Sequence, residues 1–342
     1  MLILQKVFTP RLLSILSSIF PVAVVIFLVL AALFVKPIVS VPHLDPLPIH
    51  PRDAFYAGTT NSQGSVWMAG RDGKVIYSEK NLSNWKIQEL PLKSNWQSIE
   101  SFGESSLIAV GNAAAVAMTT DLGKSWKSIK LPEDFGLGAI KLLQVKYHPN
   151  YGLWILGEFG TILRSTDSGQ SWKRMNVKSD VAWNDIAFSD KGISIVGEFG
   201  RALFSADKGS VWRPVKTPIT SSLMALAIQA GGVGYAVGLE GKILKTSDGG
   251  QTWQNSDSIT KSHLFAVTHL NDDFYIAGDQ GVIAKKDTAK IWKLLSENSG
   301  DLSWKTNFIK AGNQLVVVGG RPLVLKDEKI QFLNSNRKES NQ

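Results

Sequence analysis

Apolar and polar residues follow two different patterns along the chain, and the change comes near residue 50. From Leu12 to Val35 no residue carries a charge. After residue 50 the apolar residues fall into short runs that end at glycines, without the 3.6-residue rhythm of an amphipathic helix. The pattern therefore predicts one N-terminal helix followed by many short β-strands.

The short runs return with a constant period. Seven of them close on a glycine, and the intervals between these glycines are 41, 46, 40, 41, 40 and 41 residues. The glycines are Gly70, Gly111, Gly157, Gly197, Gly238, Gly278 and Gly319. A period near forty with four short strands per unit is typical of propeller blades, and closing the units into a ring removes exposed sheet edges. We predict an all-β, seven-bladed β-propeller over residues 53–333, preceded by one transmembrane helix.

A turn motif, hydroxyl-x-Asp-x-Gly-x-x-Trp, occurs four times within this period. The Asp accepts local hydrogen bonds, the Gly permits a positive φ, and the Trp buries a large ring at the start of the next strand. Because four copies spread around a ring cannot share one site, we interpret the carboxylates as structural. The motif residues are Asp121, Gly123, Trp126, Asp167, Gly169, Trp172, Asp207, Gly209, Trp212, Asp248, Gly250 and Trp253. In the sixth unit Asp287 and Trp292 remain, but Ala289 replaces the glycine.

The uncharged segment predicts an N-terminal membrane anchor over residues 1–36. A helix of its length would span roughly 36 Å, more than the roughly 30 Å of a hydrocarbon core. A cleaved signal peptide is the alternative, but Ile38 stands where a small residue is wanted. Lys6 and Arg11 precede the segment and would remain cytoplasmic. We expect a single-pass protein of the bacterial inner membrane, with its propeller on the periplasmic side, or on the lumenal side of a thylakoid if the host is photosynthetic.

Two polar segments flank the predicted propeller. Residues 37–52 contain five prolines, which favours an extended linker. Residues 334–342 are polar and predict a disordered tail.

Composition narrows the classes of function. The chain has no cysteine and a net charge of +8, of which +6 lies beyond residue 50. This excess is too small to predict nucleic-acid binding. The five histidines show no metal-ligand spacing. We predict no catalytic residues, no cofactor and no metal.

Charged residues gather in the predicted turns between the second and third strands of each blade, which also contain Gly-x-x-Gly runs. In a propeller these turns emerge on one face around the central channel. We predict a partner-binding surface there, in which the arginines contact carboxylates. Its candidate residues are Arg71, Arg201, Arg321, Glu158, Glu198 and Glu240. The channel is predicted to be lined by a polar ring of Gln97, Lys146, Asn184, Asp185, Gln229, Thr268 and Asn307.

The Asp-x-Gly-x-x-Trp turns, the Val-Gly-x-x-Gly-x-Ile run before them and the seven-unit count resemble the photosystem II stability/assembly factor propellers, which carry Asp-box (BNR) repeats. The resemblance covers roughly residues 53–333 and is strongest in Gly157–Trp172, Gly197–Trp212 and Gly238–Trp253. It implies a non-enzymatic, membrane-associated scaffold that binds a membrane protein complex and assists its assembly or stability. The chain lacks the lipobox cysteine of many photosynthetic members.

Other functions and one structural question stay open. In a non-photosynthetic bacterium the partner could be a transporter. The alternative function is a glycan-binding module or a sialidase-like glycoside hydrolase, although the Phe/Tyr-Arg-Ile-Pro sequence of sialidases is missing. The ring could close by packing of complete blades, or by a swapped strand in which residues 54–59 complete the last blade.

Overall fold

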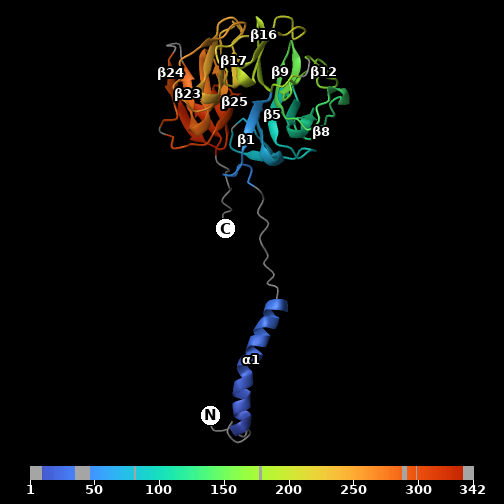
Figure 1. Cartoon of the computed structure of the whole chain (residues 1–342), viewed down its shortest axis with the longest axis vertical. Coiled ribbons are helices and arrows are strands. Elements are labelled where there is room, and N and C mark those ends of the chain that lie inside the picture. Colours follow the sequence, from blue (N-terminus) through green and yellow to red (C-terminus); the bar gives the residue numbers. More distant parts are fainter. Residues whose placement is uncertain are drawn as a thin grey trace. The chain divides into compact units, whose positions relative to one another are not determined.

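A computed structural model describes residues 10–34, 47–80, 82–176, 179–286, 291–297 and 299–333 of the chain. The chain divides into two compact units, Met1–Pro46 and Leu47–Gln342. In the first unit a helix, α1, spans Pro10–Phe34 and contains Pro21 (Figure 1). No helix in the residues whose placement is described is long and apolar enough to cross a membrane. The predicted transmembrane helix is therefore not supported.

The second unit consists of seven four-stranded antiparallel sheets, each built from four strands that are consecutive in the chain. The predicted seven-bladed β-propeller is thus confirmed. Blade one contains β1 (Phe55–Thr60), β2 (Val66–Gly70), β3 (Val75–Ser78) and β4 (Trp85–Gln88); blade two contains β5 (Trp96–Phe102), β6 (Ser106–Gly111), β7 (Val116–Thr119) and β8 (Lys127–Ser128); blade three contains β9 (Leu142–His148), β10 (Gly152–Gly157), β11 (Ile162–Ser165) and β12 (Lys173–Arg174).

The other four blades repeat this arrangement. Blade four contains β13 (Trp183–Ser189), β14 (Gly192–Gly197), β15 (Ala202–Ser205) and β16 (Arg213–Val215); blade five contains β17 (Leu223–Ile228), β18 (Gly234–Gly238), β19 (Ile243–Thr246) and β20 (Gln254–Asn255); blade six contains β21 (Leu264–Leu270), β22 (Asp273–Gly278), β23 (Ile283–Lys286) and β24 (Trp292–Leu294); blade seven contains β25 (Lys305–Ala311), β26 (Gln314–Gly319), β27 (Leu323–Lys326) and β28 (Lys329–Phe332).

The second strand of each blade is apolar because both of its faces are covered by neighbouring blades. All residues of β2 and β14 are buried, and in β6, β10, β22 and β26 only the first residue is partly accessible. The short outermost strands, such as β8 and β20, are exposed. The core is therefore a ring of apolar layers between adjacent blades.

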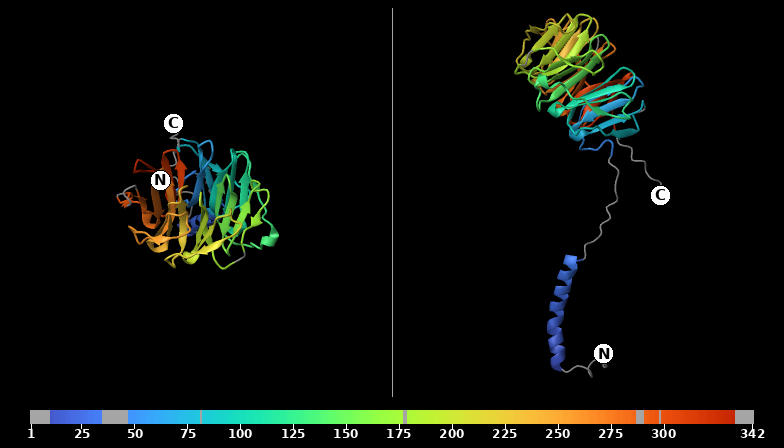
Figure 2. Two further views of the ribbon diagram at one scale, coloured as in Figure 1. Left: turned by 90° about the horizontal axis from the view of Figure 1, so that it is seen from above. Right: turned by 90° about the vertical axis from the view of Figure 1, so that its right-hand side faces the viewer.

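The ring closes by packing of two complete blades. Strand β1 pairs with β2 in the sheet of blade one, so the swapped-strand alternative is wrong. Phe55 and Met68 of blade one share a buried cluster with Ile309 and Val316 of blade seven. The Thr60 hydroxyl also donates a hydrogen bond of 2.7 Å to the carbonyl oxygen of Lys310. The views in Figure 2 show the last blade, in red, next to the first blade, in blue.

An insertion over residues 132–138 precedes blade three and accounts for the one long repeat interval. It contains a 3₁₀ turn over Glu133–Phe135. Phe135 and Leu137 of this insertion are buried against the cluster between blades two and three. Three predicted features lie outside the described residues. They are most of the proline-rich linker, the tail 334–342, and the positions of Asp287 and Ala289 in blade six.

Candidate functional site

The four complete Asp-box turns connect the third and fourth strands of blades two to five and use their carboxylates internally. In blade two, the Thr119 hydroxyl donates a 2.7 Å hydrogen bond to Asp121 Oδ1 and accepts one of 3.0 Å from the Gly123 N–H. The Ser125 N–H and hydroxyl donate to the two oxygens of Asp121 at 2.9 and 2.5 Å. Both carboxylate oxygens of Asp121 thus have a donor within their own turn.

These hydrogen bonds stabilise the ionised carboxylates. Donation from the side chain of Ser171 and from its backbone N–H lowers the pKa of Asp167 to about 2, and Ser125 has the same effect on the pKa of Asp121. In blade four, valine stands at the position of this serine. Val211 therefore donates a hydrogen bond to Asp207 from its backbone N–H but has no hydroxyl to donate a second one. The pKa of Asp207 is still lowered. Carboxylates held in this way are poorly suited to proton transfer near neutral pH.

The Asp-box glycines also bring each blade against the preceding one. Gly209 has a φ of +84°, and a Cβ added there would lie 2.3 Å from Cη2 of Trp154 in blade three. Gly123 approaches Trp67 of blade one in the same way, with 2.4 Å for the corresponding contact. The glycine is therefore required both by the backbone and by the close approach of a neighbouring side chain.

The turns between the second and third strands lie where the inner strands begin. The backbone N–H of the first turn residue donates to the carbonyl oxygen preceding the inner strand of the same blade, as from Arg71 to Ala54 at 2.9 Å and from Glu198 to Ala182 at 3.0 Å. We call the surface formed by these turns the turn face. It comprises residues 71–74, 112–115, 158–161, 198–201, 239–242, 279–282 and 320–322.

The three predicted glutamates are not equivalent within the turn face. Glu158 and Glu198 occupy the first turn position, and their carboxylates accept 2.8 Å hydrogen bonds from the backbone N–H groups of Lys141 and Ala182. Glu240 occupies the second position, with a φ of 58°. The Ser221 hydroxyl donates to its carboxylate at 3.1 Å.

The three predicted arginines all lie in the turn face, but they belong to three different blades. Arg71 and Arg321 belong to blades one and seven, which are neighbours, whereas Arg201 lies in blade four. Arg71 pairs with Asp72 at 3.4 Å, and the Arg321 guanidinium lies 3.8 Å from the centre of the Phe332 ring. Arg201 lies over Phe199 at 5.8 Å and makes no ion pair with the described residues. Arg201 and Arg321 are thus both exposed without an ion pair among the described residues, and Arg201 is the one that lies beside Phe199.

Two exposed phenylalanines on the turn face were not among the predicted site residues. Phe159 and Phe199 occupy the second turn position of blades three and four, and their exposed fractions are 56% and 61%. Beside Phe159 lies a pocket of about 560 Å³, also lined by Leu137 of the insertion, by Ile140 and by Arg174. The repeated Gly-Glu-Phe-Gly sequence marks both turns, but the sequence alone does not show that the rings remain uncovered.

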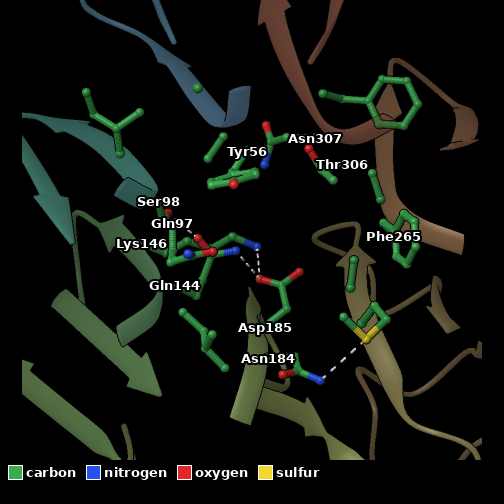
Figure 3. Close-up of a pocket in the computed structure, with 18 of the residues that line it drawn as sticks. Tyr56, Gln97, Ser98, Gln144, Lys146, Asn184, Asp185, Phe265, Thr306 and Asn307 are labelled. Atoms are coloured by element: carbon green, nitrogen blue, oxygen red, sulfur yellow. Dashed lines mark hydrogen bonds and ion pairs between the residues drawn. The ribbon is translucent and has the colours of Figure 1, made fainter. Parts of the chain in front are cut away.

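The inner strands of all seven blades surround a central channel of about 340 Å³ (Figure 3). Of the predicted polar ring, Gln97, Lys146, Asn184, Asp185, Thr268 and Asn307 line it, whereas Gln229 does not. Gln229 lies beyond the end of β17, where its side chain donates to the carbonyl oxygen of Asn271 at 3.2 Å.

Asp185 connects three neighbouring blades at the channel wall. Lys146 pairs with Asp185 Oδ1 at 2.6 Å, and the Gln144 side-chain amide donates to the same oxygen at 2.9 Å. The Leu226 N–H, in blade five, donates to Oδ2 at 2.9 Å. With its oxygens occupied by protein donors, this carboxylate is not free to act as a nucleophile.

Glu100 is an ionisable channel residue that the sequence analysis did not single out. Burial raises its pKa to about 7, although Lys146 and the Tyr147 backbone N–H favour its ionised form. Among the described residues, no group of His, Asp and Glu side chains is arranged to hold a metal ion.

Comparison with known proteins supports the predicted resemblance. Residues 204–310 match the family model described as "Photosynthesis system II assembly factor YCF48". No curated protein matches the chain.

Three solved structures share the fold. The structure "YCF48 bound to D1 peptide" is 18% identical, with a TM-score of 0.66, and the match covers 83% of this chain and 96% of that one. YCF48 from Cyanidioschyzon merolae is 15% identical, with a TM-score of 0.68 and coverages of 83% and 99%. The Niastella koreensis GH74 enzyme is 12% identical, with a TM-score of 0.66 and coverages of 82% and 53%. At these identities the likeness shows the fold alone.

Proposed function

We propose that this protein is a non-enzymatic scaffold that binds a membrane protein and assists the assembly or stability of its complex. The observation that carries the proposal is the turn face, where Arg201 and two phenylalanines are exposed on a rigid ring. The family-model match supports an assembly role, and the similar propeller solved with a D1 peptide supports a polypeptide as ligand. The partner is a photosynthetic complex in a photosynthetic host, or a transporter in another bacterium.

Co-purification from solubilised membranes tests the proposal. The tagged full-length chain is expected to recover one membrane complex, and the Arg71→Ala, Arg201→Ala, Arg321→Ala triple variant to recover much less of it. In cells lacking the protein, that complex should accumulate to a lower level. Equal recovery by the triple variant would remove the arginines from the proposal. An unchanged level of the complex would remove the assembly role.

The location of the propeller is proposed from the sequence alone. Lys6 and Arg11 precede the uncharged segment 12–35, which favours a cytoplasmic N-terminus and a propeller on the outer side. Protease added to intact spheroplasts should digest the propeller, while a cytoplasmic control protein stays intact. Protection of the propeller in spheroplasts, followed by digestion after lysis, would contradict the outward location.

Glycoside hydrolysis is a second candidate because the GH74 enzyme shares the fold and because Glu100 has the raised pKa that a general acid requires. Against it, both oxygens of Asp185 accept hydrogen bonds from protein groups, and the channel has a volume of only about 340 Å³. Purified protein should not release product from fluorogenic β-glucosides or sialosides. Turnover that disappears in the Glu100→Gln variant would favour the enzyme over the scaffold.

A further inference from the structure

We propose that Phe159 and Phe199, with Arg174 and Arg201 beside them, form a docking surface for an extended polypeptide segment that carries acidic and apolar side chains in turn along one face, two residues apart. The inference rests on the proposed function, because it assigns a place and a chemistry to partner binding. The proposed surface consists of the turns 158–161 and 198–201 of blades three and four, together with the pocket beside Phe159.

The backbone at both phenylalanines gives the first argument. Their φ angles are 52° and 58°, the left-handed region that a bulky side chain occupies at an energetic cost. In the other described turns with this geometry, the same position holds Asp72, Ala113, Glu240 and Gln280. Neither backbone preference nor burial accounts for an exposed phenyl ring there. Contact with a partner does account for it.

The pocket beside Phe159 gives the second argument. Leu137 and Ile140 are themselves buried in the core between blades two and three, so the wall they contribute is held in place. The volume of about 560 Å³ is ample for a large apolar side chain. A partner residue inserted here would bury apolar surface that the free protein leaves accessible.

Unbalanced basic groups give the third argument. The Nε and Nη1 atoms of Arg174, which lines the pocket, are buried without an acceptor among the described residues. Arg201 stacks over Phe199 and has no ion pair there. The carboxylates of Glu158 and Glu198 are directed to backbone N–H groups of their own blades, and the exposed Asp180 is the acidic residue that lines the pocket. Two guanidinium groups beside two apolar contacts favour a ligand with carboxylates.

The occupant is an extended chain with side-chain carboxylates. In an extended segment, successive side chains point to opposite sides and residues two apart share a face. A segment in which every second residue is in turn acidic and apolar therefore presents both kinds of group to the same surface. A side-chain carboxylate lies at the end of flexible methylene groups, so it reaches a guanidinium that lies below the surface. A terminal carboxylate would carry its backbone amide into an apolar pocket, where the amide would lack partners.

A fluorescence-anisotropy titration of the purified full-length chain in detergent tests the surface. The probe is a fluorescein-labelled, C-terminally amidated peptide with three Glu-Ser-Phe-Ser repeats, in which Glu and Phe share one face of the extended chain; it is called the Glu-Phe peptide. We expect it to bind. We expect the matching peptides with Gln in place of Glu (the Gln-Phe peptide) or with Ser in place of Phe (the Glu-Ser peptide) to bind at least tenfold more weakly. The same peptide with a free C-terminus should bind as well as the amidated one.

Protein variants locate the binding. Phe159→Asn with Phe199→Asn should weaken binding at least tenfold without lowering the melting temperature, because asparagine tolerates the left-handed region. Arg201→Gln should weaken binding of the Glu-Phe peptide but not of the Gln-Phe peptide. Gln280→Asn, at the same turn position of blade six, is the matched control for the first pair. Arg213→Gln, which removes an exposed arginine over Phe204 at 4.9 Å, is the control for the second.

Several results would overturn the inference. They are no binding of the Glu-Phe peptide at millimolar concentration, equal binding of the Glu-Ser peptide, binding that requires the free C-terminus, or unchanged affinity of the double asparagine variant. The inference and the proposed function can fail separately. Peptide binding without recovery of a membrane complex would reject only the assembly role, and recovery without peptide binding would reject only this surface.

Discussion

Single residues decide how closely the blades approach one another. In the Asp-boxes, a hydroxyl and a carboxylate form the turn, while the glycine has a positive φ and lies against a side chain of the preceding blade, which is an indole at Gly123 and Gly209. The spacing of Asp, Gly and Trp revealed the turn in the sequence. The contact with Trp67 or Trp154 could not be predicted, because it joins residues of different blades.

Replacing Gly209 with alanine tests this double requirement. The added Cβ would lie 2.3 Å from Cη2 of Trp154 at a φ of +84°. We expect Gly209→Ala to lower the free energy of unfolding by about 3 kcal/mol, from overpacking and backbone strain together. Gly103→Ala is the control, since its φ is +60° but nothing lies within 4 Å of the added atom. It should cost about 1 kcal/mol, as measured by urea denaturation. Equal losses would show that the blade contact does not matter.

Glu100 makes stability depend on pH. Its pKa rises from 4.5 to about 7 on folding. Between pH 4.5 and 7, the folded state therefore keeps a proton on Glu100 that the unfolded state has already released. Stability is therefore unaffected below pH 4.5 and falls as the pH rises toward 7, by up to about 3 kcal/mol. Glu100→Gln should remove this part of the decline in melting temperature, whereas the exposed control Glu104→Gln should not. The same decline in both variants would contradict the assignment.

At the scale of the blade, the last unit replaces the missing Asp-box with an ion-pair cluster. The turn of blade seven lacks the Asp-box motif, and its Glu328 accepts hydrogen bonds of 3.1 Å from Lys285 and 2.8 Å from Lys293 of blade six. Lys285 also pairs with Asp273 at 3.0 Å. Blade seven is thus joined to its predecessor by ion pairs, where blades two to five use a glycine contact. The sequence showed the loss of the motif but not its substitute.

Removing this carboxylate should have a small, salt-dependent effect. We expect Glu328→Gln to lower the free energy of unfolding by about 0.5 kcal/mol at low ionic strength, because the carboxylate is partly exposed. The difference from the unmodified protein should shrink in molar salt. Glu79→Gln, which removes an exposed pair with Lys86 at 3.5 Å, should change little. A Glu328→Gln effect that is independent of salt would argue for lost packing instead.

At the scale of the whole molecule, the number of blades followed from the seven glycines, since their period depends only on local strand lengths. The closure did not, because a complete blade and a swapped strand give the same spacing. Gly58 shows what closure requires: a Cβ added there would lie 2.3 Å from Cδ1 of Ile309 in blade seven. The convergence of Phe159 and Phe199 on one face likewise depends on the ring. Only their shared tetrapeptide was visible in the sequence.

The central claim is that the turn face contacts a membrane protein partner. Photo-crosslinking in intact cells tests it most directly, with a photoreactive phenylalanine analogue in place of Phe199. The control carries the analogue in place of Asn150, in the hairpin between β9 and β10 at the opposite end of blade three. The account predicts a crosslink to one membrane protein from position 199 and none from position 150. Crosslinking from position 150 alone, or equally from both positions, would contradict it.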